Sequence, residues 1–449
     1  MIITIAMGLA LLLTPRLPRQ RTTTVPTEQF ASLTKQETAL FAAVAAGNID
    51  RVKVLLEKGT PVNVADAYEI TPLMTAAGGG HIAITRYLLD KGASVNARTE
   101  WGRTALTEAV ERQSVPMVQL LLLRGADPNT FVVGNSRQIG FTPLIRAIWQ
   151  GNLPLVDALI QGKANVNHPG EDRRTPLLEA VAFKKVPIVK LLLAKGANVN
   201  VQDSARHTPL MEAAGEANAT IARLLLEKGA DLKARDNLGQ TALLHAASHG
   251  NSRMLHLLLD RGEDANARRD DGRTPLMLAA TADHPEAVRL LVKRGANLNT
   301  LLEKRTLEGG TALILVTYAS TTAFGNLDDP RHQTRLAAMV RLLLELGADP
   351  NITTPLGHTA LTWAAAHGNR PAAKLLLGRG ADVNHVDQQG NTVLMWTAAL
   401  GRPEMLRFLL ERGANLQVHN KQGETPLAMA SRYGNKATLR FLLNKNTGQ

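Results

Sequence analysis

The sequence of 449 residues contains no cysteine, and aromatic residues make up only 4 % of it. The absence of cysteine excludes disulfide bonds, thiolate metal sites and thiol catalysis. Because 45 % of the residues are nevertheless hydrophobic, a packed core is expected, and small aliphatic side chains must fill it. Leucine and alanine are therefore the expected core residues.

Sequence patterns that carry enzyme chemistry are also missing. No Gly-x-Gly-x-x-Gly opens a helix after a strand, and neither a Gly-Lys-Ser/Thr phosphate loop nor a Gly-x-Ser-x-Gly turn occurs. Gly78, Gly79 and Gly80 are consecutive, but they end a short predicted helix and are more typical of a helix stop than of a phosphate site. We therefore expect no enzyme activity and no cofactor.

A long apolar run is lacking except at residues 1–13, which carry no charge. This run is shorter than the ~17–25 residues of a membrane-spanning helix. It matches the length of a signal-peptide core, although it lacks a basic start and an Ala-x-Ala cleavage site. A wrongly assigned start codon is a third interpretation. We expect export or membrane anchoring through residues 1–13, with a cytoplasmic location as the alternative, and a Pro/Arg/Thr-rich linker up to residue 26.

What the sequence does contain is one short phrase, repeated. A Thr is followed by Pro, Ala or Val, then Leu, and three residues later usually by Ala. The twelve copies begin at Thr38, Thr71, Thr104, Thr142, Thr175, Thr208, Thr241, Thr274, Thr311, Thr359, Thr392 and Thr425. Eight of the eleven intervals are 33 residues, a period typical of stacked helical units. The three longer intervals place insertions near residues 131–137, 301–305 and 319–333.

Each copy predicts two helices, and positions within it are counted here from its threonine. The Thr is a typical helix N-cap and Pro suits the first helical turn. Position Thr+2 is Leu in all twelve copies, and Thr+5 is Ala in ten. About twenty residues after the Thr, a Leu-Leu-x-Lys/Arg-Gly-Ala pattern predicts the end of a second helix at glycine. The ninth copy carries the largest insertion, and we expect a weak point or hinge there.

This pattern closely resembles the ankyrin-repeat family. The resemblance covers residues 27–449 and implies an all-α solenoid of about twelve helix-turn-helix units with β-hairpin-like loops. One departure is consistent: no copy has the family's usual His at Thr+3. The resemblance also implies a non-catalytic scaffold or adaptor that binds a protein or peptide in a concave groove.

The net charge of +12 suggests nucleic acid as a partner, but a structural cause explains much of it. In ten copies Thr+20 is a Lys or Arg at the predicted C-terminus of the second helix, where a cation is favourable. A nucleic-acid or anionic-surface binder acting through Arg-rich loops is therefore the second hypothesis. An exported protein acting on an envelope or host protein is the third.

His245 and His249 have the i, i+4 spacing of metal ligands on one helix. No third ligand is evident in the sequence around them, and both occupy positions that vary between copies. We therefore expect no metal site.

The groove that the resemblance implies is lined by positions Thr+4 and Thr+8 and by the loop just before each Thr. All four tryptophans fall at or near such positions, and Trp and Tyr are enriched at interface hot spots. The residues expected to bind a partner are Tyr68, Trp101, Arg103, Glu108, Arg112, Phe141, Arg146, Trp149, Glu179, Phe183, Glu212, His245, His249, Trp363, His367, Trp396 and Tyr433.

We expect two sub-sites in this groove, with the ninth copy between them. The first is mixed to acidic and is edged by arginines, whereas the second is aromatic, through Trp363, Trp396 and Tyr433. We expect the replacement of Trp363 and Trp396 by Ala to abolish binding at the second sub-site and to leave thermal unfolding nearly unchanged.

Overall fold

The computed structural model describes residues 33–133, 140–302, 309–318, 329–433 and 436–446. Within these residues the chain forms 24 α-helices and one short 3₁₀ helix, η2 (Glu171–Arg173), and has no extended strand. The helices form two compact units, Met1–Asn165 and Val166–Gln449. Each unit is a stack of helix pairs, as the periodicity and the family resemblance predict.

The first unit contains four helix pairs. They are α2 (Lys35–Ala45) with α3 (Ile49–Glu57), α4 (Pro72–Gly79) with α5 (Ile82–Asp90), α6 (Ala105–Glu111) with α7 (Val115–Leu123), and α8 (Pro143–Gln150) with α9 (Leu153–Gln161). The first helix of each pair contacts the first helix of the next, and α3, α5, α7 and α9 contact one another in the same way. The unit therefore has two helix layers.

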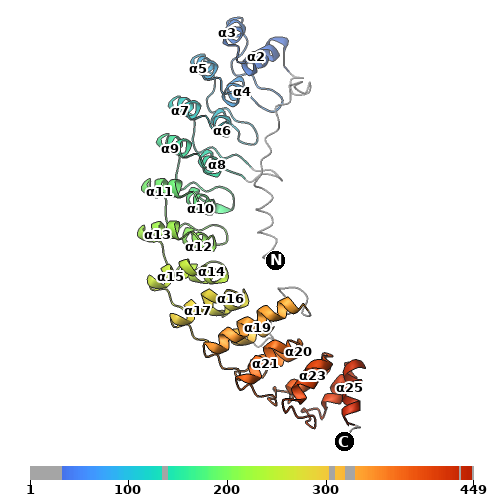
Figure 1. Ribbon diagram of the computed structural model, residues 1–449. Helices are drawn as coiled ribbons and strands as arrows, with labels where there is room; N and C mark the ends of the chain where they lie inside the picture. The colour runs from blue at the N-terminus through green and yellow to red at the C-terminus, as the bar shows by residue number, and fades with distance from the viewer. Residues whose placement is uncertain (1–32, 134–139, 303–308, 319–328, 434–435, 447–449) are drawn as a thin grey trace. The chain divides into compact units, whose positions relative to one another are not determined.

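The second unit contains eight pairs in the same arrangement. They are α10 (Pro176–Ala182) with α11 (Val186–Ala194), α12 (Pro209–Gly215) with α13 (Ala219–Glu227), α14 (Ala242–Ser248) with α15 (Ser252–Asp260), α16 (Pro275–Thr281) with α17 (Pro285–Lys293), α18 (Ala312–Tyr318) with α19 (Pro330–Glu345), α20 (Ala360–Ala366) with α21 (Arg370–Gly378), α22 (Val393–Ala399) with α23 (Pro403–Leu410), and α24 (Pro426–Arg432) with α25 (Lys436–Asn446). Figure 1 shows α10, α12, α14 and α16 in one layer and α11, α13, α15 and α17 in the other.

The repeated threonine begins the first helix of nearly every pair. Thr71 and Thr142, for example, each accept a backbone N–H bond from the residue three positions on, and Pro follows at the first helical position. The prediction of Thr38 as the first of these caps is wrong. Helix α2 begins earlier, because Thr34 and Glu37 form a reciprocal capping box that satisfies two backbone N–H groups. Thr38 lies inside the helix, where its hydroxyl donates to the Thr34 carbonyl.

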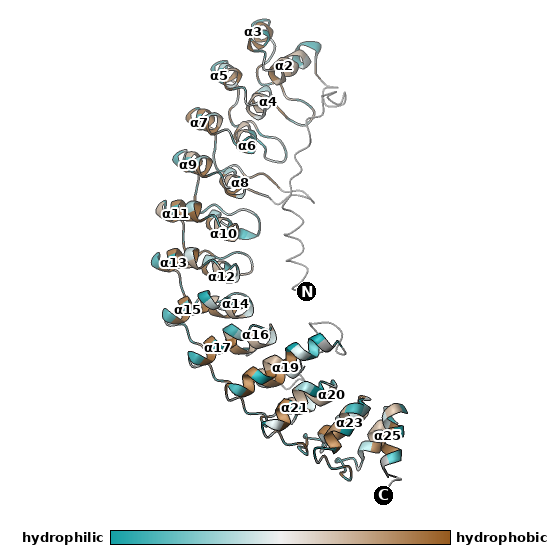
Figure 2. Ribbon diagram, in the orientation of Figure 1, coloured by the Kyte–Doolittle hydropathy of each residue, from teal (hydrophilic) through white to brown (hydrophobic). Residues whose placement is uncertain are grey.

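The core lies between and within the layers, at the positions that the repeat keeps constant. The Thr+2 leucines from Leu40 to Leu394 are at most 1 % exposed, and burying one such side chain stabilises the fold by about 1.5–3 kcal/mol. Leu427, in the last copy, is only half-buried, because no further pair packs on it among the described residues. Figure 2 shows apolar residues along the packed sides of the helices.

Asparagine side chains tie successive repeats together. The Asn96 amide donates to the Gly125 carbonyl at 3.0 Å, and its oxygen accepts the Asp127 N–H at 2.8 Å. The same pair of bonds, with acceptor and donor 29 and 31 residues ahead, is made by Asn63, Asn167, Asn200, Asn266, Asn351 and Asn384. These residues stand eight positions before the repeated Thr, so each bond pair crosses a repeat boundary.

The ninth pair differs from the others because its second helix, α19, is sixteen residues long. Figure 2 shows polar residues in its first turns, and apolar ones follow where it packs. Arg335, in the added part, forms a 2.6 Å ion pair with Asp283 of the preceding repeat. Part of the predicted insertion at 319–333 is thus extra helix, while residues 319–328 lie outside the described part. The hinge stays a prediction.

The loops between repeats are close to hairpins at three places. Isolated antiparallel bridges join Val132 to Phe141, Leu302 to Gly310, and Val386 to Thr392. The first two pairs flank the predicted insertions, of which residues 134–139 and 303–308 are not described. The apolar run at residues 1–13 and the linker up to 26 also lie outside the described residues. Among the helices that are described, none is both long and apolar enough to cross a bilayer.

Candidate functional site

The candidate site is the surface formed in each unit by the first helices of the pairs and by the loop tips that precede them; we call it the helix–tip face. A buried residue at Thr−5 shapes many of these tips. Oδ1 of Asp236 accepts the N–H groups of Leu238 and Gln240 at 2.8 and 2.9 Å. Asp66, Asp203, Asp387 and Asn420 do the same in their own loops. Such Asx-type bonds fix the tip without help from a strand.

Because one oxygen of the Thr−5 aspartate is held by backbone N–H groups, the other oxygen can contact side chains on both sides. In three places this second oxygen contacts the residue at Thr−1 of the preceding repeat. The residue at Thr+4 of the aspartate's own repeat lies against it or near it. The three sets are Arg174, Asp203 and Glu212; His207, Asp236 and His245; and His358, Asp387 and Trp396. A single register therefore brings together residues from two repeats.

Arg174 is the centre of the first set. Its guanidinium lies 2.6 Å from Glu179, 3.5 Å from Asp203 and 3.7 Å from Glu212. Burial raises the pKa of Glu212, and the Arg174 charge only partly opposes that shift. Glu179 and Glu212, on which the prediction of a mixed-to-acidic first sub-site rests, thus pair with Arg174 of the same protein.

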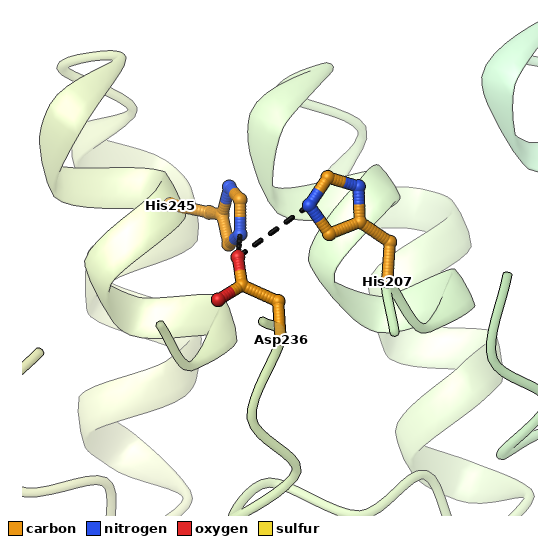
Figure 3. Close-up of side chains that lie close together, drawn as sticks. All are labelled: His207, Asp236 and His245. Atoms are coloured by element: carbon orange, nitrogen blue, oxygen red, sulfur yellow. Dashed lines mark hydrogen bonds and ion pairs between the residues drawn. The ribbon is translucent and has the colours of Figure 1, made fainter. Parts of the chain in front are cut away.

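The second set is drawn in Figure 3. The Asp236 carboxylate rises from its loop between the two imidazoles, with Oδ2 2.9 Å from Nε2 of His245 and 3.4 Å from Nε2 of His207. The two rings are edge to face, with centroids 5.2 Å apart. Although burial acts to raise it, hydrogen bonds from His245 and from the backbone N–H groups of Gln240 and Leu238 hold the pKa of Asp236 well below its usual value.

The third set lies in an aromatic cluster near the end of the second unit. Asp387 accepts a 2.8 Å bond from Nε1 of Trp396, and Nε2 of His358 lies 3.5 Å from the same oxygen. Although burial acts to raise it, hydrogen bonds from His358, Trp396 and Asn391 lower the pKa of Asp387 to about 2.

The cluster continues from this set to the ring of Trp363. That ring is edge-on to Tyr318 and His358 and stacks on His367 at 5.9 Å. Burial, together with the charge of Arg402, lowers the pKa of His367 to about 4. Trp363 and Trp396 are therefore half-buried and packed against neighbouring side chains. We expect both rings to contribute to stability, and the second sub-site stays a prediction.

In the first unit, several expected partner-binding residues contact one another. Arg103 lies 2.7 Å from Glu108, which is the Thr−1 to Thr+4 relationship of Arg174 and Glu179. Phe141 is only 9 % exposed and packs with Val132, Ile145 and the half-buried Trp149.

Three other members of the expected set differ in their surroundings. Arg146 lies 2.8 Å from Glu111, and Arg112 is exposed beside Gly80. Phe183 is half-buried at the C-cap of α10.

The aromatic residues that remain open to solvent are fewer than the sequence analysis expected. Tyr68 and Trp101 are 59 % and 50 % exposed at the tips of two successive loops, and Val133 of the next loop is also 50 % exposed. The Val133 N–H donates to the carbonyl of Trp101 at 2.9 Å, so two of these tips are directly joined. Tyr433, at the C-cap of α24, is 58 % exposed.

Sequence reasoning missed His207, Asp236, His358 and Asp387. The i, i+4 spacing pairs His245 with His249 as candidate metal ligands. In the structure, however, Nδ1 of His249 lies 2.9 Å from the His245 carbonyl oxygen, and the His249 side chain is exposed. The signal that could have found the sets is register: His207 and His358 both stand at Thr−1, and Asp236 and Asp387 both stand at Thr−5 of the next copy.

A comparison with family models identifies the same repeats. The family model described as ankyrin repeats (3 copies) matches residues 40–132, 96–169, 144–236, 177–269, 210–302, 333–420 and 371–449. Among solved structures, the crystal structure of the human ASB11 ankyrin repeat domain is 32 % identical, with 50 % of this chain and 98 % of that chain covered and a TM-score of 0.42. No curated protein matches the chain significantly.

Proposed function

Because the chain belongs to the ankyrin-repeat family, whose members generally bind other proteins, we propose that it is a non-catalytic scaffold whose helix–tip face recognises a protein or peptide. In each unit the face extends over several repeats. An extended surface of this kind suits a macromolecular ligand better than a metabolite, which needs an enclosed pocket.

The observation that carries this proposal is the row of exposed apolar tips in the first unit, formed by Tyr68, Trp101 and Val133. The fold does not require large apolar side chains there, since position Thr−3 is Asp172, Asp271, Gln389 or Gln422 in other repeats. Aromatic side chains held in solvent on a rigid support are typical of hot spots, where truncation costs about 2 kcal/mol or more of binding free energy.

Paired arginines argue against the alternative of a nucleic-acid or anionic surface. Arg103 and Arg174 lie against carboxylates at 2.7 and 2.6 Å. Arg235 and Arg269 likewise pair with aspartates near the loop tips. Their charge is therefore largely neutralised where the tips would meet a phosphate backbone.

The test is retention of partners by the purified full-length chain from lysate of its source organism, at low and at high salt. Three forms are compared: the wild type, the double variant Tyr68→Gln/Trp101→Gln, and Leu123→Gln. Glutamine is natural at this tip position in two other repeats, so the double variant should fold. Leu123 is 83 % exposed at the end of α7, in the other helix layer, which makes its variant a matched control.

We expect a specific protein to be retained at both salts by the wild type and the control and lost by the double variant. Equal retention by all three forms would overturn the assignment of the tips. Recovery of nucleic acid alone, released by salt, would favour electrostatic binding instead.

A further inference from the structure

We propose that His207, Asp236 and His245 form a binding site for a divalent transition cation of the Zn²⁺ class. The three residues come from two successive repeats: His207 precedes α12, Asp236 lies in the next loop, and His245 belongs to α14 (Figure 3). One ligand atom from each lies within 4.8 Å of the other two. Two imidazoles and one carboxylate are a donor set that Zn²⁺ favours.

The distances suit a tetrahedral cation after a small adjustment. Metal–ligand bonds of ~2.0–2.1 Å require ligand atoms roughly 3.3 Å apart. The distance from Asp236 Oδ2 to Nε2 of His207 is 3.4 Å, and that to Nε2 of His245 is 2.9 Å. The cation replaces the proton that the 2.9 Å contact shares, so this pair opens slightly while the imidazoles turn towards each other. Three protein ligands leave the fourth position open.

The carboxylate is held in place for this role by its backbone bonds. Oδ1 of Asp236 accepts two backbone N–H groups, so Oδ2 stays directed at the imidazoles, with the Gln240 amide 3.3 Å away as an additional donor. The Asp236 side chain is only 1 % exposed. Hydrogen bonds of this kind to a ligating carboxylate keep it oriented and raise the affinity for the metal.

His207 has a second carboxylate behind it. Its Nδ1 lies 4.0 Å from Oδ2 of Asp203, and its Nε2 faces Asp236. A carboxylate on this side of a ligating imidazole fixes the tautomer that leaves the other nitrogen free for metal once the two groups come within hydrogen-bond distance. The His207 side chain is 36 % exposed, which gives a cation access from solvent.

The set built on Asp387 supplies an internal comparison. There the same register holds His358, Asp387 and Trp396, and Nε1 of Trp396 donates to the carboxylate at 2.8 Å. An indole can tie a loop to a helix but cannot ligate a metal. The structural tie is thus available without a second histidine, and only the set at Asp236 has three ligating groups.

The comparison also suggests a variant that removes one metal ligand and keeps the structural contact. His245→Trp should keep the tie to Asp236, as Trp396 does at Asp387, and remove one metal ligand. His207→Gln removes the other imidazole and leaves the contact between Asp236 and His245 intact, so a folding defect in one variant would not prevent the test.

The measurement is equilibrium dialysis of the metal-free full-length chain against Zn²⁺, with bound metal determined per chain and Co²⁺ absorption recorded in parallel. We expect the wild type to bind one Zn²⁺ more than either variant, with at least a ~10-fold loss of affinity at this site in both. The visible Co²⁺ bands should weaken in both variants. Because other histidines bind Zn²⁺ equally in all three forms, the difference isolates this site. Equal stoichiometry and equal spectra in folded proteins would overturn the proposal.

A gain-of-function variant tests the same register. Trp396→His should complete a second set with His358 and Asp387 and raise the stoichiometry by one Zn²⁺. An unchanged stoichiometry would contradict the claim that this register makes a metal site. Neither experiment involves the protein partner, so failure here would leave the proposed recognition function standing.

Discussion

The indole nitrogen of Trp396 donates a 2.8 Å hydrogen bond to Oδ2 of Asp387, the aspartate that shapes the loop before the same helix. The contact joins a loop tip to a helix across nine residues. The ring also lies edge-on to His358, with centroids 5.4 Å apart. Trp396 is thus a structural residue even if it also contacts a partner.

Replacement of Trp396 by Ala should therefore destabilise the protein. The variant loses a hydrogen bond to a charged group and part of a packed ring, and we expect a loss of about 2–3 kcal/mol in the free energy of unfolding. Urea unfolding with an unchanged slope would measure it. Trp101→Ala, at an exposed tip, should stay within about 0.5 kcal/mol of the wild type. Equal midpoints for Trp396→Ala and the wild type would show that the ring does not contribute to stability.

Two of the arginines at Thr−1, Arg103 and Arg174, give a matched comparison of a more exposed and a more buried ion pair. Arg174 and Glu179 have side chains 27 % and 9 % exposed, whereas Arg103 and Glu108 are 47 % and 17 % exposed. Arg174→Met would leave the buried Glu179 and the half-buried Glu212 without their cation, so we expect a loss of about 2–3 kcal/mol at pH 7. Arg103→Met should cost about 0–1 kcal/mol. Chemical unfolding of both variants at low salt checks the order, and equal losses would contradict it.

The repeated threonine, the constant leucine and the 33-residue period were enough to predict the helix pairs, because they report local capping and burial. Thr38 failed because a capping box four residues earlier competes with it, which the repeat register alone does not reveal. The sets around Asp203, Asp236 and Asp387 were not predicted, since their members come from different repeats. Only the stacking of one pair on the next brings such residues within bonding distance.

Glu263 should make stability depend on pH. It stands where other repeats have a buried Ala, such as Ala93 and Ala296, and its Oε1 is buried without a hydrogen-bond partner. Burial, with the nearby Asp231 and Asp264, raises the pKa of Glu263 to about 7. Between about pH 4.5 and 7 the unfolded chain loses this proton while the folded chain keeps it. The contribution of Glu263 to stability therefore falls as the pH rises through this window.

Two variants separate charge from packing at this position. Glu263→Ala should raise the free energy of unfolding at pH 8 by about 2 kcal/mol, and Glu263→Gln, which cannot ionise, should flatten the same part of the pH profile. Thermal unfolding from pH 4 to pH 8 measures both effects. If the wild-type profile and that of Glu263→Gln had the same slope between pH 5 and 7, the assignment would be contradicted.

Lys233 occupies the position from which asparagine ties other repeats together. In the preceding repeat, Asn200 donates to the Gly229 carbonyl at 3.1 Å and accepts the Asp231 N–H at 2.8 Å. The corresponding groups ahead of Lys233 are the Gly262 carbonyl and the Asp264 N–H. Lys233 is exposed, and its ammonium can donate a hydrogen bond but cannot accept one.

Lys233→Asn should therefore add a bond pair across this repeat boundary and stabilise the protein by about 1 kcal/mol. Lys233→Gln removes the same charge, but its longer side chain does not match the spacing that every tying asparagine shares, so its urea midpoint should stay near that of the wild type. The reverse change, Asn200→Ala, should lose about the same free energy as Lys233→Asn gains, because it leaves the two backbone groups to water. If Lys233→Asn and Lys233→Gln raised the midpoint equally, the gain would come from the removed charge, and the asparagine tie would not be its cause.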